Sequence, residues 1–244
     1  MKSTALSLKN RLLPLFAGLA LLAGCASIGP TDDPVQRHFS WDRYVGGDDL
    51  ATNCKPGEPT RYRLVYNGIY AEQRRSYDFT AQPDGGALLE ARVIGSGTLT
   101  AITLTEPLKP WQGDKALHRL NAAEFERVTA ALRDAGFEAT AKKGLELRGD
   151  DFYWTASACR NGIFHFNAWA AEGYPGEMPA FDRARFLDVL APFDHTGVAV
   201  NPPRKVALPP YALMMNQARE KPNQPPHRYI VGDNGLIYTQ RAFN

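Results

Sequence analysis

The dipeptide Asn161-Gly162, which separates two runs rich in aromatic residues, is the feature that most constrains the fold of this chain. Asparagine and glycine both tolerate positive φ angles, as the two-residue type I′ turn of a β-hairpin requires. A hairpin built on this turn has a single register, in which Cys159 lies opposite Phe164 and Trp154 lies opposite Trp169. The sequence therefore predicts an antiparallel pair of strands whose partners can be named.

Successive side chains of a strand point to opposite faces, so this hairpin has two distinct faces. One face, which we expect to be buried, carries Tyr153, Cys159, Phe164 and Phe166. The other carries Trp154, His165, Asn167 and Trp169. This second set has two interpretations. It could bind a sugar or another flat ligand by stacking on the tryptophans, or it could pack beneath a helix or the proline-rich segment described below.

Residues 61–104 also have the alternating pattern of β-strands, in runs over 61–66, 76–80, 87–94 and 99–104. A tight turn at Asp84-Gly85-Gly86 separates two of these runs. Four antiparallel strands are predicted here. The Arg74-Arg75 pair is interpreted as a solvated loop or strand end.

The clearest helix is predicted over residues 121–136, where Asn121 and Glu124 form a capping box and Gly136 supplies the left-handed residue after the end. Its apolar stripe consists of Phe125, Val128 and Leu132. A second helix is predicted over residues 181–190, with Pro192 ending it. These patterns give an α+β fold, a mostly antiparallel sheet with two packed helices.

A proline-rich C-terminal extension follows, because residues 201–227 hold seven of the chain's 18 prolines. Prolines disfavour helices and central strands, so we expect an extended arm. Its apolar side chains favour contact with a surface, of the same domain or of a partner; they are Leu208, Tyr211, Leu213, Met214 and Met215. A short hairpin around Asp233-Asn234-Gly235 is predicted at the end.

The sequence Asn-Gly, followed by an aliphatic and an aromatic residue, recurs at Tyr66-Asn67-Gly68-Ile69-Tyr70 and at Arg160-Asn161-Gly162-Ile163-Phe164. An internal duplication would explain the recurrence. Recurring turn chemistry between strands explains it more simply, because asparagine and glycine are both common turn residues.

The N-terminus has the organisation of a signal peptide. Lys2, Lys9 and Arg11 make it positive, and residues 12–23 are apolar but too short to span a bilayer, which needs about 20 apolar residues. The motif Leu22-Ala23-Gly24-Cys25 follows. It places a bulky aliphatic residue and two small residues directly before a cysteine.

This motif resembles the lipobox of bacterial lipoproteins. The resemblance covers only the leader and Cys25, and it implies that residues 1–24 are removed and that lipid, including palmitate, is attached to Cys25. Two or more acyl chains anchor a protein stably to a membrane. Because Ala26 replaces the aspartate of the enterobacterial retention signal, the outer membrane is favoured over the inner one. The alternative is an ordinary secretory peptide followed by an unrelated cysteine.

The predicted organisation has four parts: a signal peptide (1–24), a tether (25–35), an α+β globular domain (36–197) and a proline-rich arm with its terminal hairpin (198–244). Beyond Cys25 the resemblance bears on none of the last three, and it does not identify the family of the mature domain.

If lipid occupies Cys25, two cysteines remain, Cys54 and Cys159. The periplasm and cell envelope are oxidising, so the two thiols are expected to form a disulfide bond. Such a bond closes a loop of roughly 100 residues and stabilises the fold by about 4–5 kcal/mol in the chain-entropy model. The alternative is two unpaired buried cysteines. No Cys-x-x-Cys or paired histidine spacing indicates a metal site.

Composition excludes one broad class of function. The chain has 28 basic and 26 acidic residues, and three of the cations belong to the leader, so the mature chain is close to neutral. That balance gives no electrostatic basis for binding nucleic acid.

No recognised catalytic motif is present. Nucleophile elbow, zinc-protease, P-loop and dinucleotide-binding patterns are all absent. The adjacent Asp194 and His195 could form a general-base pair, but neighbouring residues rarely point toward each other, and no nucleophile motif accompanies them. No catalytic residue, metal or cofactor is therefore predicted.

We therefore expect a lipid-anchored cell-envelope protein that binds a ligand or supports an assembly without catalysis, and that contacts a protein partner through its C-terminal arm. An envelope hydrolase and a glycan-binding module are the alternatives. Converging His, Asp or Ser groups in a pocket would favour the hydrolase, and an exposed shelf of Trp154 and Trp169 would favour glycan binding.

Overall fold

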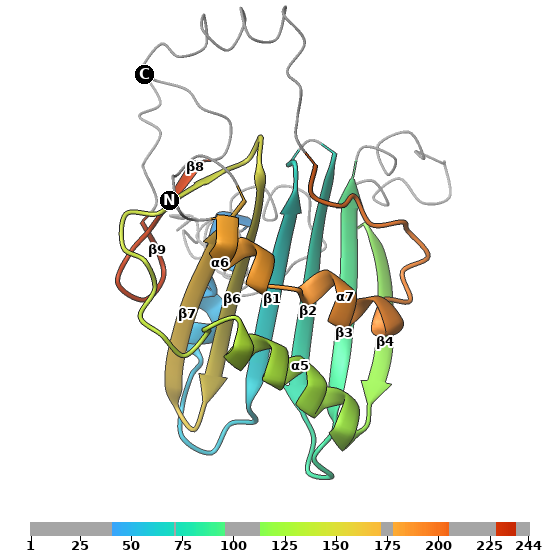
Figure 1. Ribbon diagram of the computed structural model, residues 1–244. Helices are drawn as coiled ribbons and strands as arrows, with labels where there is room; N and C mark the ends of the chain where they lie inside the picture. The colour runs from blue at the N-terminus through green and yellow to red at the C-terminus, as the bar shows by residue number, and fades with distance from the viewer. Residues whose placement is uncertain (1–40, 71, 96–112, 172–177, 205–227, 238–244) are drawn as a thin grey trace, which may run out of the picture.

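A six-stranded antiparallel sheet forms the centre of the computed structural model, which describes residues 41–70, 72–95, 113–171, 178–204 and 228–237 (Figure 1). Its strand order is β4-β3-β2-β1-β6-β7. The strands are β1 (Arg61–Gly68), β2 (Gln73–Ala81), β3 (Ala87–Gly95), β4 (Asp114–Leu120), β6 (Phe152–Arg160) and β7 (Ile163–Ala170). The predicted mostly antiparallel sheet is confirmed, and with the few helices that the structure describes the fold is α+β or mostly β.

The central hairpin forms in the predicted register. In β6 and β7, Cys159 lies opposite Phe164, and Trp154 lies opposite Trp169. The turn residue Asn161 has a φ of 52° and is followed by Gly162 at 78°, as a type I′ turn requires.

Three of the four strands predicted over residues 61–104 are confirmed as β1, β2 and β3, with Asp84-Gly85-Gly86 in the turn between β2 and β3. The fourth, residues 99–104, lies outside the described residues. β4 was not predicted. It lies at the edge of the sheet and mixes Asp114, Lys115 and Arg119 with its apolar residues, so its sequence lacks an apolar strand pattern.

One face of the sheet, here called the helix face, carries Leu64, Tyr77 and Trp154 and is covered by α5 (Ala122–Asp134) and α7 (Phe186–Leu190) (Figure 1). The predicted capping box of α5 is present, because the Asn121 side chain accepts the Glu124 N–H while the Glu124 carboxylate accepts the Asn121 N–H. Val128 and Leu132 of its apolar stripe are buried, and the partly buried Phe125 packs against the same core.

The second predicted helix is broken into two. α6 (Met178–Arg183) ends before α7 begins, and a 3₁₀ turn, η3 (Ala191–Phe193), contains Pro192 instead of stopping before it. In one straight helix, Phe181 and Leu190 would point in opposite directions, at about 100° per residue. The break allows both side chains to be buried, with 6% and 1% of their surface exposed.

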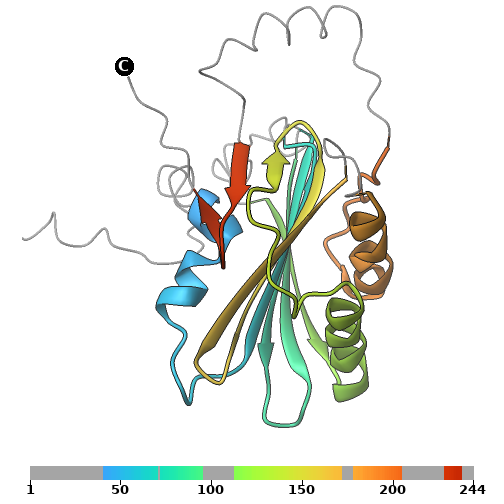
Figure 2. The ribbon, with the colours of Figure 1, turned by 60° about the vertical axis from the view of Figure 1, so that its left-hand side comes forward.

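The opposite, or second, face carries Val65, Ser76 and Tyr153 and is covered by different elements (Figure 2). One is the helical segment of residues 41–52, which includes α3 (Asp48–Thr52). The other is a three-stranded sheet in the order β5-β8-β9, made of β5 (Glu146–Arg148), β8 (Arg228–Val231) and β9 (Leu236–Ile237). The fold therefore has three layers, with the large sheet in the middle.

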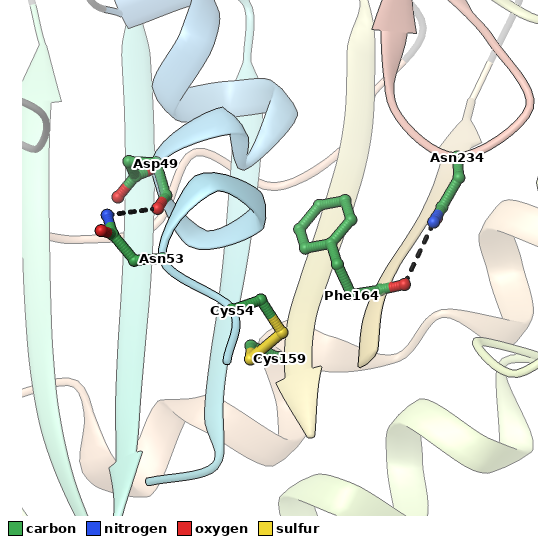
Figure 3. Close-up of a disulfide and its surroundings, with 6 residues drawn as sticks. All are labelled: Asp49, Asn53, Cys54, Cys159, Phe164 and Asn234. Carbon is green, nitrogen blue, oxygen red and sulfur yellow. Dashed lines mark hydrogen bonds between the residues drawn. A yellow bond between two sulfur atoms is a disulfide. The ribbon is translucent and has the colours of Figure 1, made fainter. Parts of the chain in front are cut away.

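The predicted terminal hairpin is present as β8 and β9, but it belongs to the folded domain, whereas the sequence assigned it to the arm. Tyr229 of β8 pairs with Leu147 of β5, and both Tyr229 and Val231 are buried in the core of the second face. The Asn234 side chain also bonds the outer edge of β7. It donates to the Phe164 carbonyl (Figure 3), and it accepts the Phe166 N–H. The domain boundary that the sequence analysis placed at residue 197 would therefore cut through a single hydrophobic core.

The rest of the arm is described only as far as residue 204. Residues 205–227, which hold most of its prolines, lie outside the described residues. Among the helices that the structure describes, none is long and apolar enough to cross a membrane.

Candidate functional site

The predicted disulfide bond joins Cys54 to Cys159, whose Cα atoms are 5.5 Å apart (Figure 3). Cys54 lies in the loop after α3, and Cys159 lies near the end of β6. The bond therefore ties the segment that covers the second face to the central sheet.

The predicted ligand face lies beneath helices, which is the other interpretation that the sequence left open. Trp154 and Trp169 are only 1% and 4% exposed. Each makes an edge contact with Phe186 of α7 at 5.2 Å between ring centroids. The Trp169 indole also donates to the carbonyl of Ala135 at 3.0 Å. The two tryptophans therefore offer no shelf on which a sugar could stack.

The two polar residues of that face hold the chain after α5. The Asn167 side-chain amide donates to the carbonyls of Gly136 and Ala139, at 3.1 and 3.2 Å. A ring nitrogen of His165 contacts the carbonyl of Phe137. These contacts satisfy carbonyl groups just beyond the helix end, where backbone acceptors lack helical partners. Both residues have structural partners.

Asp194 and His195 do not form a catalytic pair. The Asp194 carboxylate accepts hydrogen bonds from Arg75, Tyr77 and Thr196, with the two hydroxyls at 2.7 and 2.6 Å. Burial would raise the pKa of Asp194, but the bonds from Thr196 and Tyr77 and the charge of Arg75 outweigh it and lower the pKa. The exposed His195 instead has its Nε2 atom 3.3 Å from the Pro192 carbonyl.

Another group of residues, which we call the Arg74 cluster, gathers at one end of the second face: Trp41, Asn67, Tyr70, Arg74 and Tyr153. Asn67 of β1 lies opposite Arg74 of β2 on one side and Tyr153 of β6 on the other. Trp41 belongs to the helical segment that covers this face. Three parts of the chain that are far apart in the sequence therefore contribute to the cluster: Trp41, the β1–β2 hairpin and Tyr153.

Arg74 lies against two aromatic rings. Its guanidinium carbon is 4.0 Å from the ring centroid of Tyr70 and 5.4 Å from that of Trp41, both within the range of cation–π attraction. Among the described residues, no carboxylate forms an ion pair with it. Burial lowers the pKa of Arg74, although the neighbouring tyrosines oppose the effect. A largely desolvated cation without a counterion is costly.

The Arg74 cluster also contains hydrogen-bonding groups that are not used. Three buried side-chain atoms have no hydrogen-bond partner among the residues that the structure describes: Trp41 Nε1, Asn67 Oδ1 and Arg74 Nε. All three belong to the Arg74 cluster. An unsatisfied buried group costs about 1–3 kcal/mol, so three together are a substantial penalty. A bound molecule that offers two acceptors and one donor would satisfy them.

The orientation of Asn67 is fixed by its neighbours. Its side-chain nitrogen donates to the carbonyls of Asp151 and Gly149, at 2.6 and 3.2 Å. Because both contacts need a donor, the nitrogen must occupy that position, and the oxygen is the atom left without a partner.

The turn that carries Tyr70 is strained. Ile69 has a φ of 65°, in the left-handed region that β-branched residues rarely adopt. The N–H groups of Glu72 and Gln73 bond its carbonyl at 2.8 and 2.9 Å and hold the turn. Strain of this kind costs on the order of 1–3 kcal/mol and tends to occur at functional sites.

Sequence reasoning missed this cluster. It treated Arg74-Arg75 as a solvated basic pair, whereas the two side chains point to opposite faces of β2, and Arg75 is fully buried. The accumulation of Asn67, Tyr70 and Arg74 within eight residues was a usable signal, but the contribution of Trp41 depends on the tertiary fold.

Comparison with known proteins finds no matching family model, no matching curated protein and no matching solved structure. Within the described residues, no group of three His, Cys, Asp or Glu side chains is arranged to hold a metal ion. The functional argument therefore rests on the residues of this chain.

Proposed function

We propose that this protein is a lipid-anchored component of the bacterial cell envelope that binds a small ligand at the Arg74 cluster. One observation carries the binding role: the three unpartnered buried atoms found among the described residues all belong to the Arg74 cluster, in which Asn67 pairs with Arg74 and the Arg74 guanidinium lies over the Trp41 ring. Ordinary packing defects would be scattered. Their occurrence in one cluster, beside a cation that has no carboxylate partner among the described residues, is typical of a site that is completed by another molecule.

The envelope location is supported by the sequence of the leader. The lipobox-like Leu22-Ala23-Gly24-Cys25 places the acceptor thiol directly after the cleavage position. The disulfide between Cys54 and Cys159 fits the same compartment, because such bonds persist in oxidising environments. With Ala26 after the lipidated cysteine, the outer membrane is the proposed destination.

A binding role fits the described side chains better than hydrolysis does. The Asp194 carboxylate, the acidic half of the only catalytic pair that the sequence suggested, bonds Arg75 and Tyr77 on the helix face. Glycan stacking is not supported, because α7 covers Trp154 and Trp169 and leaves no exposed ring for a sugar.

Residues 205–227 remain the proposed contact for a protein partner. The chain before them is fixed to the domain, since Gln73 donates to the Ala199 carbonyl at 2.8 Å and Arg204 bonds Glu72 at 2.6 Å. The chain after them enters β8. The segment is therefore attached to the domain at both ends, and it carries the apolar residues expected of a contact surface.

The anchor is tested by Cys25→Ser, with Cys54→Ser as the control that removes a different cysteine. Cys25→Ser should abolish labelling by a palmitate analogue and release the protein from membranes, whereas Cys54→Ser should be labelled normally. An unlabelled Cys25→Ser protein that stays on membranes in high salt would contradict the proposal.

The binding role is tested by native mass spectrometry of the lipidated protein, extracted from its own envelope in mild detergent. We expect a bound mass that disappears in the double variant Asn67→Leu/Arg74→Met and persists in Arg185→Met, which changes an exposed arginine paired with Asp188. A bound mass that survives the double variant would contradict binding at this site. So would wild-type protein that carries no added mass and gains none when incubated with envelope extract.

A further inference from the structure

We infer that the ligand of the Arg74 cluster is a carboxylate with a neighbouring N–H group, as at the carboxyl terminus of a peptide or in an N-acylated amino acid. The inference rests on the proposed binding role and adds the chemical class of the ligand. It follows from the charge of the site, from the kinds of atoms that lack partners and from the pairing of Asn67 with Arg74 across adjacent strands.

The charge of the site favours a monoanion. Arg74 is the cation in contact with the rings of Trp41 and Tyr70, and the second free donor, the Trp41 indole, is neutral. A carboxylate would bring one negative charge and neutralise the single guanidinium. A phosphate dianion would leave one charge uncompensated in a largely buried place, which is costly.

The donors match the two oxygens of a carboxylate. Arg74 Nε and Trp41 Nε1 each lack an acceptor among the described residues, and the guanidinium carbon lies 5.4 Å from the centroid of the Trp41 ring. A carboxylate can accept at both oxygens, with several lone pairs in its plane. Hydrogen bonds from a guanidinium to a carboxylate are among the stronger ones in proteins.

The remaining atom requires a donor from the ligand. Asn67 Oδ1 is an acceptor, and an ionised carboxylate has no hydrogen-bond donor to offer it. Asn67 and Arg74 are directly opposite on adjacent strands, where Cα atoms lie about 4.5–5.5 Å apart. The N–H of an acylated amino acid is one carbon away from its carboxylate, so one small group can reach both residues.

The experiment compares three small probes by titration of the lipidated protein in detergent, followed through the indole N–H signal of Trp41 in ¹H–¹⁵N spectra. The chain has four tryptophans, and Trp41→Phe identifies the signal. N-acetylglycine has both the carboxylate and the N–H, acetate lacks the N–H, and N-acetylglycinamide lacks the charge. We expect N-acetylglycine to shift the Trp41 signal saturably and to bind at least about tenfold more tightly than the other two probes.

Variants of the binding residues provide a second test, in which the affinities of the probes are compared within each folded variant. Arg74→Met should abolish the preference for N-acetylglycine over N-acetylglycinamide, and Asn67→Leu should abolish its preference over acetate. Arg185→Met should retain both preferences. A single cooperative urea transition, at whatever midpoint, establishes that each variant is folded.

Several outcomes would overturn the inference. Equal affinity for the charged probe and its amide would refute the carboxylate, and equal affinity for N-acetylglycine and acetate would refute the N–H. Tighter binding of inorganic phosphate would also refute it, as would failure of every probe to shift the signal. Each of these results leaves the bound mass of the native protein as a separate measurement, so the binding role can stand when the ligand class fails.

Discussion

Arg74 and Arg75 are consecutive residues of β2 that face opposite sides of the sheet and have opposite surroundings. On the helix face, the buried Arg75 pairs with Asp194 and donates to Gln73 at 2.8 Å and to the carbonyl of Val198. On the second face, Arg74 has aromatic neighbours and an Nε atom that finds no hydrogen-bond partner in the described part of the chain. The same residue type therefore has its hydrogen-bonding groups paired on the helix face and leaves hydrogen-bonding capacity unused on the second face.

The difference does not mean that the second face is loosely built. There, Arg63 donates to Asp49 at 2.6 and 2.9 Å and to Asp78 at 2.7 Å, and its guanidinium lies 3.6 Å from the Tyr44 ring centroid. Burial raises the pKa of the Tyr44 hydroxyl, and the charge of Asp78 adds to the effect. The disulfide fastens the same layer. Unsatisfied groups that persist within such a network are more informative than those at a loose surface.

The largest expected effect tests whether the second face is part of one core. Removing residues 228–244 deletes β8 and β9 and exposes the partners of Tyr229 and Val231. The free energy of unfolding should fall by more than the roughly 3–5 kcal/mol of a single large aromatic truncation, as measured by urea denaturation.

Its matched control replaces residues 205–227 with a Gly/Ser linker of equal length and keeps the hairpin. Stability should then stay near that of the wild type, because loop closure depends mainly on loop length. Partner capture in intact cells should weaken. A linker variant that unfolds, or a truncation that remains fully stable, would contradict the assignment of the hairpin to the domain.

The next effect separates the two arginines directly. Arg75→Met leaves Asp194 without its cation and should lower the free energy of unfolding by about 3–5 kcal/mol. Arg74→Met removes an uncompensated charge and should leave that free energy unchanged or raise it. Urea denaturation of both variants gives the comparison. Equal losses would mean that Arg74 is as structural as Arg75.

A smaller effect is expected from the covalent tie. The double variant Cys54→Ala/Cys159→Ala should lose about 2–4 kcal/mol. Hydrogen exchange should accelerate in residues 41–52 more than in α5, because the bond fastens only the layer of the second face. Uniform acceleration across both layers would contradict this. Free thiols at both positions in envelope-derived protein would refute the bond itself.

The smallest effect concerns acid stability on the helix face. The folded-state pKa of Asp194 lies below its ordinary value, so its charged form stabilises the fold fully above about pH 4. This contribution is lost as the pH falls through the folded-state pKa. Asp194→Asn should therefore be less stable at neutral pH and lose less stability below about pH 4, as followed by urea denaturation between pH 2 and pH 7. If the free energy of unfolding falls equally in the wild type and in Asp194→Asn below about pH 4, the assigned role of Asp194 is wrong.

Local patterns predicted much of the fold. The register of β6 and β7 followed from Asn161-Gly162, because a two-residue turn leaves no freedom in the pairing. The start of α5 followed from Asn121 and Glu124, whose capping contacts lie within one helical turn. Both predictions depend on residues that are close together in the chain.

The candidate site could not be predicted in the same way, because its unpartnered atoms are defined by contacts between distant segments. Asn67-Gly68 shares its sequence pattern with Asn161-Gly162, but it continues β1, and the turn forms later, where Ile69 adopts positive φ. Which face Arg74 takes, and whether a carboxylate meets it, depend on the pairing of β1 with β2 and on the placement of Trp41. The sequence pattern contains neither fact.

The most direct test of a ligand site on the second face is a high-resolution crystal structure of the lipidated protein, purified from its own envelope with no ligand added. We predict density for a bound molecule other than water between Trp41, Asn67 and Arg74. Its acceptors should lie within hydrogen-bond distance of Trp41 Nε1 and Arg74 Nε, and its donor within that distance of Asn67 Oδ1. Ordered waters alone on all three atoms, or a side chain of this protein occupying the place, would contradict the account.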